Sequence, residues 1–403
     1  MNIFTNPIAT RPVRTVFKLA CIAAILAGCG GGGDSGTTST TSFASGPIQG
    51  FGSIIVNGVR FDDSSAKVSS DDDDNGESRN RSELKLGMVV DIQGGATSSD
   101  DSGRHGKAND IRFGSELVGP VTALAVDGFT LLGQTVKVST MTLFDDSIAR
   151  GLAGVAVGNV LEVHGLYDAA AKVYNATRVE IKAAPALYKI RGAVEDLQTT
   201  AKTFKIGPEL ISYENASSVP NPLANGQIVR VKLQTTKNAV TGAWSATKVK
   251  SGVRKVEDHN EAEIKGTITN FSSANDFEVD GRKVDASGVN NKPAGLAAGV
   301  RVEIHGRSAN GVIIANRIEI EDRNGAGAGE FEFHRRVVSS NAQNKTFILA
   351  TTTIEWTDNT SFEKGATAAS LTPNTCVEVK AVTVSGSTNL RATRIKLDNS
   401  CTQ

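Results

Sequence analysis

The chain has 403 residues, of which 43 are basic and 43 acidic, so its formal net charge is zero. This length allows several domains. Balanced charge and only 5% aromatic residues argue against a single-strand nucleic-acid binder, which needs stacking rings along a basic groove. We therefore expect no nucleic-acid partner.

The first 28 residues are typical of a secretory signal. Arg11, Arg14 and Lys18 precede a short apolar run that is too short to span a bilayer as a helix. The run ends in Leu-Ala-Gly-Cys at 26–29, which resembles the lipobox of bacterial lipoproteins and implies that Cys29 is lipidated. The alternative is an ordinary signal with a chance cysteine. Gly30, where inner-membrane retention would usually place aspartate, favours the outer membrane by the same resemblance, with the chain facing the periplasm or the cell surface.

A Gly/Ser/Thr-rich stretch follows Cys29, and a repeated phrase follows the stretch. The composition of residues 29–46 predicts a flexible tether. One glycine recurs early in the first strand of the phrase, at Gly50, Gly119, Gly192 and Gly266. A second opens a later strand, at Gly87, Gly158, Gly226 and Gly299, with Asn374 in the fifth copy. An alanine marks the last strand, at Ala108, Ala176, Ala246, Ala315 and Ala392. A fixed period of this kind indicates repeated modules.

Each copy predicts the same five strands. Alternating apolar residues and turns such as Asn57-Gly58 and Asp280-Gly281 predict three strands, a variable connection and a closing hairpin. A module of about 70 residues has little core unless its sheet closes. We therefore predict an all-β chain of about five small OB-like barrels in series, with small β-sandwich modules as the alternative.

The predicted boundaries follow the repeat. They are 1–28 (signal), 29–46 (tether), 47–117 (module 1), 118–185 (module 2), 186–256 (module 3), 257–322 (module 4) and 323–403 (module 5, with a hinge at 323–329).

The opening Gly-Pro-Ile-Gln-Gly-Phe-Gly-Ser-Ile-Ile-Val-Asn-Gly-Val (46–59), the Leu-x-x-Gly-x-x-Val-x-Val segments and the Ala-x-x-Ile closings resemble the bacterial domain-of-unknown-function 5666 family. Its modules often occur in tandem in predicted lipoproteins. The resemblance is best in copies one, two and four and weakest in copy five. It supports the architecture and implies no activity or site.

The remaining cysteines suggest a disulfide. With Cys21 in the signal and Cys29 lipidated, Cys376 and Cys401 are left, and two such thiols outside the cytoplasm are expected to pair. The bond would hold the C-terminal tail against the preceding strand. Two unpaired thiols are the alternative.

Module 3 is the basic one, with 11 basic and 4 acidic residues. Its cations are candidates for binding an anionic partner such as lipopolysaccharide, an acidic polysaccharide or an envelope protein. They are Lys189, Arg191, Arg230, Lys232, Lys248, Lys250, Arg254 and Lys255. The alternative interpretation is complementarity with module 4, or solvated strand faces.

Metal and catalytic signals are weak. Asp71, Asp73 and Asn75, in an insertion of module 1, match the first half of a calcium loop, but Ser82 stands where an EF-hand needs glutamate. A solvated acidic loop is the favoured interpretation. No GxSxG, HExxH or phosphate-loop motif is present, and we expect neither catalytic residues nor a cofactor.

These observations favour a non-catalytic binding, spacer or scaffold protein of the cell envelope. A periplasmic assembly factor that binds an anionic component through module 3 is the alternative, and an enzyme is a remote one.

Overall fold

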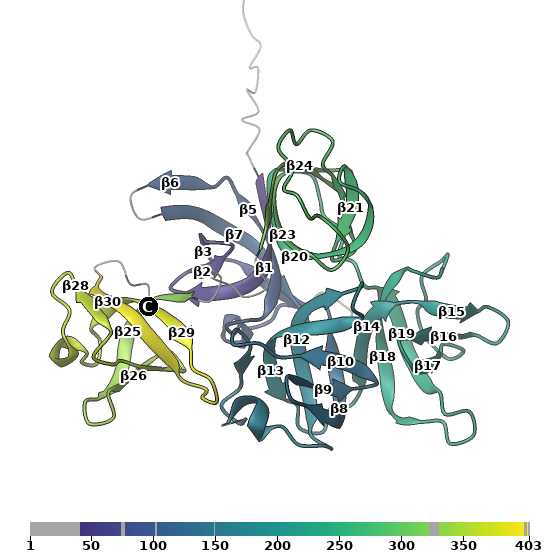
Figure 1. Cartoon of the computed structure of the whole chain (residues 1–403), viewed down its shortest axis with the longest axis horizontal. Helices are drawn as coiled ribbons and strands as arrows, with labels where there is room; N and C mark the ends of the chain where they lie inside the picture. Colours follow the sequence, from purple (N-terminus) through teal and green to yellow (C-terminus); the bar gives the residue numbers. More distant parts are fainter. Residues whose placement is uncertain are drawn as a thin grey trace, which may run out of the picture. The chain divides into compact units, whose positions relative to one another are not determined.

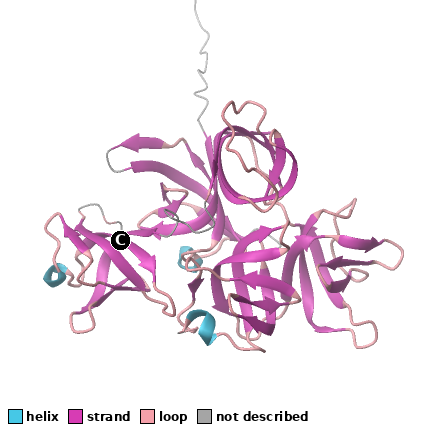
Figure 2. Cartoon of the chain, in the orientation of Figure 1, coloured by secondary structure: helices cyan, strands magenta, loops and turns pink. Residues whose placement is uncertain are grey.

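The computed structural model describes residues 41–73, 77–100, 103–148, 150–321, 330–398 and 401. In these residues the chain folds almost entirely into strands (Figure 2), interrupted by short 3-10 helices. The strands form five small closed barrels, which we call barrels 1 to 5 in chain order (Figure 1). The all-β prediction is confirmed.

Barrel 4 illustrates the topology. Its strands are β20 (His259–Ser273), β21 (Asp276–Val279), β22 (Arg282–Asp285), β23 (Arg301–Ala309) and β24 (Val312–Ile320). The first three form an antiparallel meander, and β22 pairs in parallel with β24. Strand β23 then pairs with both β24 and β20. This closed ring is the five-stranded Greek key of an OB-like barrel, so the sandwich alternative is not what forms.

The other four barrels repeat this ring of pairings. Barrel 1 contains β1 (Thr41–Phe51), β2 (Ile54–Val56), β3 (Val59–Asp62), β4 (Lys67–Ser70), η1 (Arg81–Glu83), β5 (Val89–Gly95), β6 (Ser98–Asp100) and β7 (Gly103–Phe113). Barrel 2 contains β8 (Leu117–Ala125), β9 (Gly128–Leu131), β10 (Gln134–Lys137), β11 (Leu143–Phe144), η2 (Gly151–Gly154), β12 (Val160–Asp168) and β13 (Val173–Ile181). Barrel 3 contains β14 (Tyr188–Ala193), β15 (Glu195–Gln198), β16 (Thr203–Ile206), β17 (Glu209–Ser212), β18 (Ile228–Lys237) and β19 (Trp244–Ser251). Barrel 5 contains β25 (Glu330–Asn341), β26 (Thr346–Leu349), β27 (Thr352–Glu355), β28 (Ser361–Glu363), η3 (Ala368–Ser370), β29 (Cys376–Thr383) and β30 (Leu390–Leu397).

One glycine anchor is set by steric contact, and register corrects its position in barrel 1. Gly119, Gly192 and Gly266 each pair with the second residue of the fourth barrel strand, and in barrel 1 the residue in that register is Gly46 rather than Gly50. A Cβ on Gly46 would lie 2.3 Å from Asn57 Oδ1, and one on Gly119 would lie 2.5 Å from Leu132 Cγ. The position therefore stays small because the turn after the second strand packs on it.

The second anchor is set by backbone conformation. The φ angles of Gly87, Gly158, Gly226 and Gly299 are 80°, 90°, 82° and 83°, and Asn374 has a φ of 71°. Glycine and asparagine tolerate this region best, which explains why asparagine replaces glycine in the fifth copy.

Main-chain pairing also joins barrels that are distant in sequence. Strand β1 pairs in parallel with β20 through 42–45 and 261–264, and with β25 through Gly50 and Phe51. Strand β8 of barrel 2 pairs with β14 of barrel 3. Contacts between the barrels are therefore not limited to neighbours along the chain.

The apolar cores follow the same grouping. Alternating strand residues of barrels 1 and 5 share one core cluster, those of barrels 2 and 3 share a second, and barrel 4 forms a third with Phe43 of β1. Barrels 1, 4 and 5 thus form one strand-paired group, and barrels 2 and 3 form another.

The described residues bear on two of the predicted boundaries. Strand β1 begins at Thr41, so the tether predicted to end at residue 46 extends no further than residue 40. Cys29 and the hinge predicted at 323–329 lie outside the described residues.

The disulfide prediction is confirmed. Cys376 and Cys401 are bonded, with their Cα atoms 5.7 Å apart. Because Cys376 opens β29 and Cys401 follows β30, the bond holds the C-terminal end against barrel 5.

Candidate functional site

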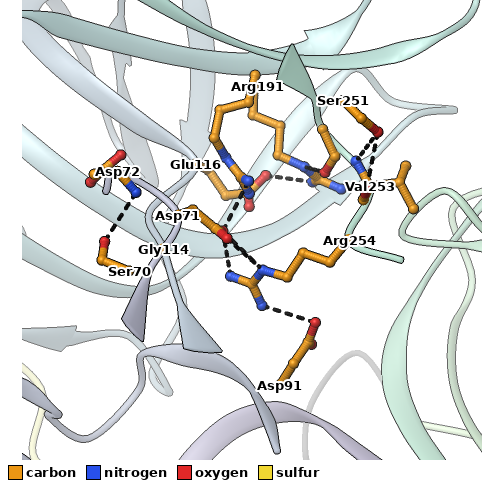
Figure 3. A network of polar contacts seen from close by, with 12 residues as sticks. Ser70, Asp71, Asp72, Asp91, Gly114, Glu116, Arg191, Ser251, Val253 and Arg254 are labelled. Atoms are coloured by element: carbon orange, nitrogen blue, oxygen red, sulfur yellow. Dashed lines mark hydrogen bonds and ion pairs between the residues drawn. The ribbon is translucent and has the colours of Figure 1, made fainter. Parts of the chain in front are cut away.

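The acidic insertion of barrel 1 meets the basic face of barrel 3 in a buried network that we call the ionic clasp (Figure 3). It contains four carboxylates and four guanidinium groups, whose side chains or residues are at most 10% exposed. Its members are Asp71, Asp91, Glu116, Asp280, Arg191, Arg230, Arg254 and Arg282.

Asp71 is held by two arginines. Arg254 Nη2 lies 2.6 Å and Arg230 Nη1 lies 2.9 Å from Asp71 Oδ2. The carboxylate is positioned by its own backbone, since Asp71 N donates to Phe113 O at the end of β7. Arg254 also reaches Asp91 Oδ2 at 3.2 Å, so in Figure 3 its guanidinium group lies between two carboxylates.

Asp91 links barrel 1 to barrel 4. Arg282 Nη2, at the start of β22, donates to both oxygens of Asp91 at 2.9 and 2.7 Å. Ser45 Oγ, directly opposite on β1, donates to Asp91 Oδ1 at 2.7 Å.

Arg191 ties barrels 2, 3 and 4 together. Its Nη1 lies 2.7 Å from Glu116 Oε2, just before β8. Its Nε donates to Gly252 O and its Nη2 donates to the main-chain oxygen of Asp280. One side chain thus fixes the entry of barrel 2, the exit of barrel 3 and the turn of barrel 4.

The electrostatics of the clasp reflect burial and charge pairing. Burial alone would raise the pKa of Asp71, but Arg254 and Arg230 outweigh it and hold that pKa far below its ordinary value. Burial would likewise raise the pKa of Asp91, and Arg282 and Arg254 lower it instead. Asp280 differs, because burial dominates there and raises its pKa to about 6.

Most of the cations predicted to bind an external anion have internal partners. Lys189 Nζ lies 2.8 Å from both carboxylate oxygens of Asp72, and Lys232 Nζ donates to the main-chain oxygen of Asp72 at 2.6 Å. With Arg191, Arg230 and Arg254 in the clasp, five of the eight predicted residues contact acidic or carbonyl groups of this chain. Of the other three, Lys255 is exposed, and Lys248 and Lys250 lie half-buried on β19. The anticipated complementarity with module 4 is thus chiefly complementarity with module 1.

The calcium interpretation of the insertion finds no support at its described residues. Asp71 is occupied by arginines, and Asp73 Oδ2 lies 3.1 Å from Arg79 Nε. Asn75 lies outside the described residues. A guanidinium partner already supplies the positive charge that a calcium ion would bring.

Two other groups of ligand-type side chains occur among the described residues. Cys376, Asp398 and Cys401 converge, but the two sulfurs are bonded to each other. Glu263, Glu303 and His305 also converge, with Arg104 2.7 Å from Glu263 and Lys265 2.7 Å from Glu303. These cations already balance the carboxylates, so the group is another ion-pair network.

Sequence inspection missed four clasp members, Asp91, Glu116, Asp280 and Arg282. One sequence signal was available for the contact between barrel 3 and barrel 1, in which Arg230 pairs with Asp71. In each barrel, one residue of the fourth strand pairs with the residue that precedes the anchor-glycine position, which Arg335 occupies in barrel 5. This fourth-strand residue is acidic in four barrels and is Arg230 in barrel 3. A charge reversal at one repeat position indicates a contact peculiar to that copy.

Three regions of the chain, 118–180, 265–319 and 337–396, match the family model described as Domain of unknown function (DUF5666). The chain carries tandem DUF5666 modules. The matched regions fall in barrels 2, 4 and 5, so barrel 5, where the resemblance was expected to be weakest, is matched, whereas barrel 1 is not among the matched regions. No curated protein matches the chain. No helix among the described residues combines the length and apolar character needed to cross a membrane.

Proposed function

We propose that this protein is a non-catalytic binding and scaffold protein of the bacterial cell envelope, held at the outer membrane by a lipid on Cys29. The observation that carries the scaffold part is the ionic clasp. It fastens barrels 2 and 3 to the strand-paired group of barrels 1, 4 and 5, so that surfaces from different barrels keep a fixed relation. Preorganised surfaces lose less entropy when they bind.

The clasp favours a scaffold over an extended spacer. A spacer needs modules that contact only their neighbours, whereas Arg254 bridges Asp71 and Asp91, and Asp71 is 183 residues away in sequence. Most of its charges also pair with one another, as Asp71 does with Arg230 and Arg254, which supports a structural role for the network.

An anionic partner for module 3 is the weaker candidate. Only Lys248, Lys250 and Lys255 of the predicted set lie outside the clasp and its Asp72 contacts, and of these only Lys255 is exposed, which is ordinary for a surface lysine. We therefore do not assign the function to this face.

The anchor is tested by fractionating cells that carry the wild-type chain or Cys29→Ser, with protease shaving and a blot for barrel 5. Wild-type protein is expected in the outer-membrane fraction and the variant in the soluble fraction. Retention of Cys29→Ser in the membrane would contradict the lipid anchor. Shaving of intact cells then separates surface from periplasmic facing.

Binding is tested separately with a photocrosslinking residue at an exposed hairpin or strand position, using Val126, Val240 and Val338 in turn. Discrete heterologous adducts are expected from at least one site in intact cells. Adducts only to the chain itself at every site would contradict a binding role.

A further inference from the structure

Barrel 5 departs from the other four at the anchor-glycine position. Arg335 on β25 pairs with Val377 in the register where Gly46, Gly119, Gly192 and Gly266 pair in the other barrels. A side chain therefore projects where the other copies have none.

The turn that packs on this position is also changed. The positive-φ turn residue is Asn57, Leu132 or Asp280 in barrels 1, 2 and 4, and each of these side chains would clash with a Cβ at the anchor glycine. In barrel 5 the turn residue is Ala350, with a φ of 54°. The bulky and small partners are thus exchanged, and the small turn leaves space beside Arg335.

A cavity of about 730 Å³ lies at this place, where barrel 5 meets barrels 1 and 2. This volume is within the range of small-molecule sites. Its apolar walls include Phe51, Phe144, Leu86 and Leu143, and Thr351, Thr352 and Thr353 provide hydroxyl groups on the barrel 5 side.

Three of the four cations that line the cavity are already paired. Arg81 Nε lies 3.0 Å from Asp63, Lys85 Nζ lies 2.9 Å from Glu180, and Arg178 contacts Glu180 and Asp145. These pairs leave little charge for a ligand.

Arg335 is the fourth cation that lines the cavity, and among the described residues it has no ion-pair partner. It has no carboxylate within ion-pair distance, and its Nε is buried without a hydrogen-bond partner. Its guanidinium carbon lies 5.8 Å from the centre of the Phe51 ring, which fixes the group at the cavity wall. Burial lowers the pKa of Arg335, and the charge of Asp63 offsets only part of this cost. An uncompensated cation beside an apolar cavity is suited to an anion that brings its own apolar body.

We propose that this cavity binds a small amphipathic anion, with its carboxylate, sulfonate or phosphate group on Arg335 and its apolar part against Phe51 and Phe144. This site would give the proposed binding function a ligand class, and its biological role rests on that function. Ligand binding at the site can be measured independently in purified protein.

The test uses the full chain carrying Cys29→Ser, which retains every described residue, and 8-anilinonaphthalene-1-sulfonate as a fluorescent anionic probe. One probe molecule per chain is expected, displaced by laurate but not by dodecanol or dodecyltrimethylammonium. Equal displacement by the cationic and anionic amphiphiles would overturn the proposal, as would absence of saturable binding. Neither result would affect the anchor or crosslinking tests.

Variants locate the site. Arg335→Gln is expected to weaken probe binding about tenfold or more, since a charge-assisted hydrogen bond contributes about 1.5–3 kcal/mol. Arg336→Gln, one residue along on an exposed side chain, is the matched control and should bind like the parent. Thr353→Trp should block the cavity and abolish binding. Near-ultraviolet circular dichroism verifies that each variant is folded, and parent-like affinity in folded Arg335→Gln would refute the assignment.

Discussion

The junction that holds the ionic clasp and the junction that holds the cavity are made by the same kind of barrel, yet one is filled and the other is hollow. In the clasp, the turn residue Asp280 packs over Gly266, and Arg191 fills the space beside it. In the hollow junction, Arg335 replaces the glycine and Ala350 replaces the larger turn side chain. The packed junction and the hollow one thus differ at the same two repeat positions.

The largest expected effect comes from removing the central cation of the clasp. Arg254→Ala leaves Asp71 and Asp91 buried with one guanidinium partner fewer each, and breaking a buried ion pair costs about 3–5 kcal/mol. Urea unfolding should be followed separately by Trp244 in barrel 3 and Trp356 in barrel 5, the two indoles of the chain, each as a single-tryptophan variant with the other indole changed to Phe.

We expect a lower urea midpoint for the Trp244 transition and a smaller change for the Trp356 transition. Lys255→Ala, the exposed neighbour, is the control and should shift neither by more than about 0.5 kcal/mol. Equal effects of the two substitutions would show that the clasp contributes nothing to stability.

An intermediate effect is expected at the anchor-glycine position itself. A Cβ on Gly192 would lie 2.5 Å from Ile206 Cγ2, so Gly192→Ala should cost about 1–3 kcal/mol by overpacking. Arg335→Gly, which gives barrel 5 the residue of the other four, should change stability by less than about 1 kcal/mol. Thermal denaturation measures both. If Gly192→Ala left the thermal stability unchanged and Arg335→Gly lowered it, the proposed difference between the two junctions would be contradicted.

The smallest expected effect is a pH dependence. The pKa of Asp280 is raised to about 6 in the folded state, so between about pH 4 and 6 the folded chain binds a proton that the unfolded chain does not. The contribution of Asp280 to the free energy of unfolding therefore falls as pH rises through this range. The pKa values of Asp71 and Asp91 are lowered, so their stabilisation is present above about pH 4 and is lost at lower pH.

The stability of the parent relative to Asp280→Asn should therefore rise between pH 6 and pH 4.5, by on the order of 1 kcal/mol, because only the parent can bind this proton. Urea midpoints of both proteins should fall on further acidification, as Asp71 and Asp91 are protonated. A parent and variant with parallel profiles from pH 4 to 7 would contradict the shift at Asp280.

Sequence patterns predicted the barrels well because the signals are local. Turn dipeptides such as Asn57-Gly58, glycines with positive φ and alternating apolar residues act within one module of about 70 residues. The clasp could not be derived in this way. Asp71 and Arg254 were each noticed, one as a calcium ligand and the other as a site for an external anion, but no local pattern states that two charges 183 residues apart are each other's partners. The only sequence signal for the cavity was that the fifth copy lacks the first anchor glycine. The effect of that change depends on how Ala350 packs, which the sequence does not state.

The pairing of β1 also has a consequence for the order in which the protein matures. Thr41 is 219 residues from Asn260, whose side chain accepts its main-chain N–H, and the far end of β1 pairs with β25 of the last barrel. Synthesis proceeds from the N-terminus, so the first strand to emerge has exposed edges until the fourth and fifth barrels are complete. Non-local pairing of this kind slows folding. The segment nearest the predicted tether therefore completes its strand pairing only after β20 and β25 have formed.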